Sequence, residues 1–135
     1  MGFNVEINAN MPVSYVLDNG TKEHKAVIKM FDYDSNGVID KQEAKAYNSY
    51  SILLPTKGDH SNTIHMLNKD RKEVHVFKYN QLSELDNFAI WNGGLFLRDK
   101  QQLIKGESTS YNSETQTITV RNKDEVKEIK LDTQG

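Results

Sequence analysis

The spacing of apolar residues changes near residue 60, and this change limits the chain to a fold that contains both helices and strands. Before it, Val27, Met30 and Phe31 recur at the three- and four-residue intervals of one helix face. After it, apolar and polar residues alternate, as they do around Ile64 and Met66, which is typical of a half-buried strand. We therefore expect helices in the first part of the chain and strands in the second.

Two helices are predicted in the first part, over residues 22–31 and 41–50, with a polar loop between them. Pro55 ends this helical part because proline cannot continue a helix. Nearer the N-terminus, alternating apolar residues predict short strands over residues 3–7 and 13–17. A break at Asn10-Met11-Pro12 separates these two strands.

The second part of the chain predicts a series of antiparallel hairpins. Residues 64–66 and 74–76 form the first, on either side of a polar turn. Later strands are predicted over residues 115–120 and 126–131, although residues 126–129 also fit a single helical turn.

The clearest hairpin turns at Asn92-Gly93. Asparagine followed by glycine suits a type I′ turn, in which both central residues have positive φ angles. This turn would place Ile90 opposite Leu95 and Ala89 opposite Phe96.

Composition argues against several classes of function. The net charge of −2 gives no global field to attract nucleic acid or an anionic membrane. The chain has no cysteine, so disulfides, thiolate metal sites and cysteine nucleophiles are absent. Its longest apolar runs are far below the roughly 20 residues that a membrane helix needs. No signal peptide is evident, so we expect a cytoplasmic protein if Met1 is the native start.

The polar loop between the two predicted helices carries an oxygen-bearing side chain at nearly every other position. A hard cation such as Ca²⁺ takes six to eight oxygen ligands at about 2.3–2.6 Å, and a tightly coiled loop can aim alternate residues at one centre. Gly37 would permit the sharp turn, and Ile39 should point inward from a short strand. The candidate metal ligands are the side chains of Asp32, Asp34, Asn36, Asp40 and Glu43 and the backbone carbonyl of Val38.

Residues 32–43 resemble the loop of the EF-hand calcium-binding family, in its calmodulin-type form, at every ligand position. The resemblance extends over roughly residues 21–50, because the positions of the family's helix-packing residues are occupied by Val27, Phe31, Ala44 and Tyr47. It implies one bound Ca²⁺, with Glu43 supplying two oxygens and Asp40 binding directly or through water.

The family usually works in pairs of hands, whereas this sequence contains one recognisable loop. A single hand must cover the apolar faces of its helices with something else. The strand-rich part of the same chain, a protein partner and a second copy of the chain in a homodimer all stay open.

Two other groups of side chains are ambiguous. His65 and His75 would face each other if Ile64 paired with Val76, and opposed histidines can bind Zn²⁺; ordinary surface positions are favoured because no third ligand is evident. An aromatic group offers either a stacking surface for a sugar or peptide or, as we favour, part of the sheet's core. Its members are Tyr79, Phe88, Trp91 and Phe96.

The sequence thus predicts an α+β fold, in which one EF-hand helix–loop–helix packs with an antiparallel sheet of hairpins. Residues 1–58 would hold the first strands and the hand, and residues 59–135 the hairpins, together as one compact unit. We expect a calcium-binding interaction or regulatory module. A structural Ca²⁺ site that stabilises a β-sheet binding domain is the alternative. No nucleophile elbow or phosphate-binding glycine loop is present, so we expect no enzyme, although unrecognised catalytic residues stay open.

Overall fold

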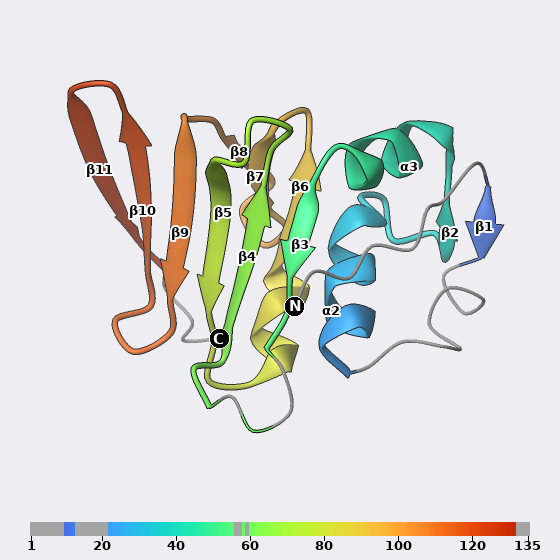
Figure 1. Ribbon diagram of the computed structural model, residues 1–135, viewed down its shortest axis with the longest axis horizontal. Helices are drawn as coiled ribbons and strands as arrows, with labels where there is room; N and C mark the ends of the chain where they lie inside the picture. The colour runs from blue at the N-terminus through green and yellow to red at the C-terminus, as the bar shows by residue number, and fades with distance from the viewer. Residues whose placement is uncertain (1–9, 13–21, 56–57, 59, 132–135) are drawn as a thin grey trace.

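The computed structural model describes residues 10–12, 22–55, 58 and 60–131, and strands outnumber helices in this part of the chain (Figure 1). None of the helices within it has the length and apolar character needed to cross a bilayer. The helices are α2 (Lys22–Phe31), α3 (Lys41–Asn48) and the 3-10 helix η1 (Leu82–Asn87). The strands are β1 (Met11–Pro12), β2 (Val38–Ile39), β3 (Ser51–Leu53), β4 (Thr63–Leu67), β5 (Glu73–Lys78), β6 (Phe88–Trp91), β7 (Gly94–Leu97), β8 (Gln102–Ile104), β9 (Ser108–Asn112), β10 (Thr117–Asn122) and β11 (Glu125–Lys130).

The largest sheet has six strands in the order β11-β10-β9-β5-β4-β3. Its β4–β5 hairpin confirms the one expected from residues 64–66 and 74–76, and its β10–β11 hairpin confirms the strands expected over residues 115–120 and 126–131. The expectation of antiparallel pairing throughout is wrong at one place, because β5 and β9 run parallel. Parallel neighbours cannot be joined by a tight turn and need a long crossover connection, and the alternating pattern in the sequence gives no sign of it.

A second sheet of three strands, β6-β7-β8, forms most of that crossover together with η1. Its first hairpin has the predicted register, with Ile90 opposite Leu95 and Ala89 opposite Phe96. Asn92 and Gly93 have φ angles of 50° and 74°, as a type I′ turn requires. Figure 1 shows this β6–β8 sheet behind the six-stranded sheet.

Helix α2 packs against η1 and β6, so the crossover lies next to the helical part of the chain. The face of α2 that the sequence predicted is buried: Val27, Met30 and Phe31 are each at most 1% exposed. Phe31 meets Tyr47 of α3 edge-to-face, with 5.2 Å between ring centroids. One continuous apolar cluster joins these helices to both sheets. The helix pair is thus covered by η1 and by strands of the same chain.

Residues near the N-terminus differ from the expectation where they are described. The predicted strands at 3–7 and 13–17 lie outside the described residues. The expected break contains β1, which pairs with β2 of the polar loop and sets Met11 opposite Ile39. Further along, β3 pairs with β4, so the six-stranded sheet includes residues from both of the stretches 1–58 and 59–135.

Strand β11 is the outer edge of the large sheet and is mostly exposed. The alternative reading of residues 126–129 as a helical turn is wrong, because all four pair with β10. Charged residues dominate this edge, from Glu125 to Lys130. Charges on an edge strand oppose pairing with further strands.

The turn at Asn92-Gly93 generates a stability prediction. Replacing Gly93 with Val should lower the free energy of unfolding by about 1 kcal/mol or more, because a β-branched residue is strained at positive φ. No atom lies within 4 Å of a Cβ built at Gly93, so the cost comes from the backbone conformation and not from a clash. Chemical denaturation measures it, with Asn92→Gly as the control that keeps positive φ accessible. A Gly93→Val protein as stable as wild type would contradict this account of the turn.

Candidate metal centre

The polar loop runs from the end of α2 to the start of α3 and is shaped by bonds from its own side chains. Asp32 accepts from the backbone N–H groups of Asn36 and Gly37, at 3.3 and 2.9 Å. Asn36 in turn accepts from the N–H of Val38 at 3.0 Å. Gly37 has a φ of 84°, as its predicted role in the turn requires. These bonds coil the loop around the carboxylate of its first residue.

Three of the predicted ligands come together. One carboxylate oxygen from each of Asp32, Asp34 and Glu43 lies within 4.8 Å of the other two. Asp32 and Glu43 are buried, with 6% and 1% of their surface exposed, whereas Asp34 is exposed. The three carboxylates of this trio are therefore close enough together to share one cation.

The other three predicted ligands stand in different settings within the same loop. Asn36 is exposed, and Val38 stands in the short strand β2 beside the buried Ile39. The Asp40 carboxylate caps helix α3 by accepting from the N–H of Glu43 at 2.8 Å. Asp40 is therefore placed as a helix cap and is not part of the carboxylate trio.

Glu43 closes the loop through both of its carboxylate oxygens. Oε1 accepts from the N–H of Asp40 at 3.0 Å, and Oε2 accepts from the N–H of Tyr33 at 2.7 Å. The first bond completes a capping box with Asp40 at the start of α3. The second ties the beginning of the loop to its end. Each oxygen keeps a further lone pair that could face a cation.

The environment of the trio disfavours negative charge. Burial raises the pKa of Asp32 above its ordinary value, partly offset by the N–H of Gly37, and neighbouring Asp34 raises it further. Burial likewise raises the pKa of Glu43, and the charges of Asp40 and Asp34 act in the same direction. Carboxyl groups in this setting are stabilised in their ionised form by a cation.

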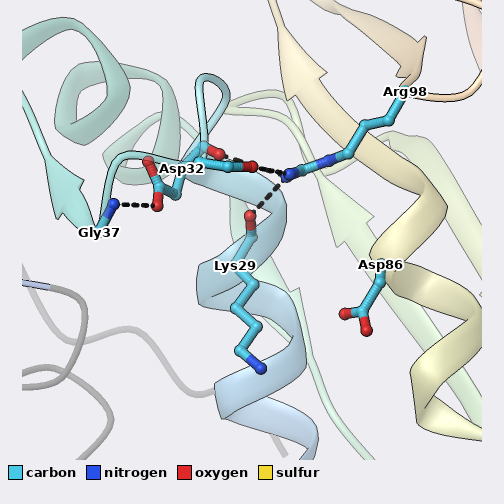
Figure 2. Close-up of a pocket in the computed structure, with 6 residues that line it drawn as sticks. Lys29, Asp32, Gly37, Asp86 and Arg98 are labelled. Atoms are coloured by element: carbon cyan, nitrogen blue, oxygen red, sulfur yellow. Dashed lines mark hydrogen bonds between the residues drawn. The ribbon is translucent and has the colours of Figure 1, made fainter.

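Tyr33 and Arg98 connect the loop to the β6–β8 sheet. The Tyr33 ring stacks on Trp91, with 4.3 Å between centroids and an interplanar angle of 12°. Figure 2 shows Arg98 extending toward the end of α2, where its guanidinium donates to the carbonyls of Lys29 and Asp32 at 2.8 and 3.3 Å. Sequence reasoning missed both roles. An aromatic residue between two acidic ligands was the available signal for Tyr33, whereas nothing near Arg98 in the sequence indicates its target.

The aromatic group identified from the sequence divides into two. Phe88 and Tyr79 are buried in the core, as favoured. Trp91 and Phe96 are only partly buried, and Phe96 meets the Tyr33 ring at 4.9 Å between centroids. Half of the group thus forms a platform for the loop.

The zinc hypothesis for His65 and His75 is wrong in its register. His65 pairs with Val76, and His75 pairs with Met66, so the two imidazoles are not opposed. His65 instead bonds to Glu73 at 2.9 Å, while His75 is 1% exposed. The reading of His75 as a surface residue is therefore wrong as well.

Comparison with known proteins adds no relative. No protein-family model, no curated protein and no solved structure matches the chain.

The burial of His75 generates a prediction about pH. Its Nδ1 lies 2.7 Å from Thr109 Oγ1, and its Nε2 has no partner among the described residues. Burial lowers the pKa of His75 from 6.5 to about 4. Between these values the unfolded chain binds the proton more readily than the folded protein does. The folded protein therefore keeps its full stability with respect to His75 above pH 6.5, and its free energy of unfolding decreases as the pH falls toward 4.

We expect His75→Gln to remove this part of the pH dependence, because glutamine does not titrate. The wild-type free energy of unfolding should fall by about 2 kcal/mol more than that of the variant between pH 7 and 5. Urea denaturation at the two pH values measures the difference. Exposed His60→Gln is the control and should behave as wild type. Equal pH dependence in His75→Gln and wild type would contradict a buried neutral imidazole.

Proposed function

We propose that this protein binds one Ca²⁺ ion through residues 32–43 in the manner of an EF-hand and acts as an interaction or regulatory module. The observation that carries the proposal is the convergence of the Asp32, Asp34 and Glu43 carboxylates within 4.8 Å in a loop between two helices. Like charges at this separation repel, and a divalent cation relieves that repulsion.

Local charges supply little other compensation. Among the described residues, the ion pairs involve other carboxylates and leave the trio out. Arg98 stands nearby, but its guanidinium donates to backbone carbonyls and to the Ser35 hydroxyl. A bound cation would provide the missing positive charge.

The donor set indicates which cation fits. Carboxylate, amide and carbonyl oxygens are hard ligands, which suit Ca²⁺ and Mg²⁺ better than Zn²⁺. Asp32, Asp34 and Glu43 would hold the ion directly, with Asn36 and the carbonyl of Val38 completing the loop's donors. Asp40, engaged as the cap of α3, fits a contact through water. About seven oxygens exceed the compact octahedron that Mg²⁺ requires, so calcium is the proposed ion.

The first test of this function is calorimetry on the purified protein with CaCl₂ and with MgCl₂. We expect one site per chain and a clear preference for Ca²⁺, because the flexible, oxygen-rich loop suits the larger ion. Asp70→Asn, an exposed change in the β4–β5 turn, is the control and should bind as wild type. Equal affinity for the two ions would contradict the calcium assignment, and absence of Ca²⁺ binding would refute the function.

A second prediction concerns the closing ligand. Glu43→Gln should lower Ca²⁺ affinity by on the order of tenfold or more, because it removes a full charge and one ligand oxygen. Asn36→Asp should change affinity far less, because its position already supplies the single oxygen required. Calorimetry on both variants compares them directly.

The same variants should differ in stability. Without calcium, Glu43→Gln should lose about 1 kcal/mol, because its amide can accept from only one of the N–H groups of Asp40 and Tyr33. It should also lose most of the rise in melting temperature that Ca²⁺ gives the wild type by mass action. A Glu43→Gln protein that binds Ca²⁺ like wild type would refute the proposed use of the loop.

A further inference from the structure

One residue of the loop contacts both the carboxylate trio and the neighbouring sheet. The backbone N–H of Tyr33 donates to Glu43, while its ring stacks on Trp91 and meets Phe96 edge-on. Trp91 and Phe96 belong to adjacent strands of the β6–β8 sheet. A displacement of Tyr33 that accompanies rearrangement of Glu43 would therefore disturb an aromatic contact more than fifty residues away in sequence.

Arg98 makes a second connection from the same sheet. It directly follows β7, and its Nε donates to the carbonyl of Phe88 on β6 at 3.3 Å. The other nitrogens of the guanidinium donate to the carbonyls of Lys29 and Asp32 and to the Ser35 hydroxyl. One rigid planar group thus bonds to the sheet, to the last turn of α2 and to the loop, and lysine could not reproduce this set of bonds.

We propose that ion binding in the loop is transmitted to the β6–β8 sheet through the Tyr33–Trp91 stack and the Arg98 bonds. This inference rests on the proposed function, because it concerns regulation by the same site. Ion binding would hold Glu43 and the start of the loop in place and so favour the arrangement in which both connections are made. The β6–β8 sheet would then resist local opening more strongly when the ion is bound.

The coupling must act in both directions. If the ion stabilises the β6–β8 sheet, the sheet must stabilise the ion-bound loop by the same free energy. Weakening either connection should therefore lower Ca²⁺ affinity, and coupling between sites typically amounts to about 5- to 150-fold. Loss of the Arg98 charge alone would act in the opposite direction, because a guanidinium near the loop repels a cation. Arg98→Lys keeps that charge and separates the two effects.

The test combines calorimetry with amide hydrogen exchange on the full chain, with and without CaCl₂. Ligand binding protects all amides that exchange through global unfolding, so the signal is protection in β6–β8 beyond that in β9–β11. Wild type should show this excess. Tyr33→Leu and Arg98→Lys should reduce it and should bind Ca²⁺ at least about fivefold more weakly. Arg121→Lys, an exposed change on β10, is the matched control and should resemble wild type.

Trp91 is the single tryptophan of the chain, so its fluorescence provides an independent signal. Its emission should change as CaCl₂ is added to wild type and should change less in Tyr33→Leu. If calorimetry detects no Ca²⁺ binding by wild type, the proposed function fails and the coupling fails with it. If Ca²⁺ binds but β6–β8 gains no excess protection, or if both variants bind as tightly as wild type, the coupling alone is overturned.

Discussion

Strands β5 and β9 lie side by side and run parallel. After β5 ends, the chain must therefore run back along the length of that strand before β9 can begin. In this protein the return path is not a single helix but η1 followed by the three strands of the β6–β8 sheet. That path passes against α2. The parallel pair therefore decides which residues meet the polar loop: Trp91, Phe96 and Arg98 are near it because they belong to the crossover.

The loop itself balances two opposing tendencies. Backbone N–H groups gather around Asp32 and Glu43 and stabilise their ionised carboxylates, whereas burial and neighbouring carboxylates act against ionisation. Both groups keep a raised pKa, so the backbone bonds do not offset the burial completely. The loop is therefore shaped by its own backbone bonds, while its buried carboxylates would still gain from a nearby positive charge.

The sequence predicted the features that depend on neighbouring residues. The helix faces, the turn at Asn92-Gly93 and the positive φ angle of Gly37 all follow from short-range spacing. It failed where distant segments determine the outcome. The partner of β9 is one such case, because alternation does not say which strand lies beside which. Arg98 is another, since its bonding partners in α2 and the loop are more than sixty residues away. His75 is the third case. The register considered from the sequence set Ile64 opposite Val76, but Ile64 lies opposite Phe77. This shift of one residue exchanges the two faces of the strand and so buries His75.

The pairing of β1 with β2 has a further consequence for any ion that the loop holds. The short strand inside the loop already has a neighbour from its own chain, so its partner is Met11–Pro12 and not the equivalent strand of another loop. Within the described residues, β2 has no second loop of this kind as its partner. If the loop binds a single ion as proposed, its occupancy would rise with ion concentration along a simple hyperbola, without the steeper rise that coupling to a paired loop can produce.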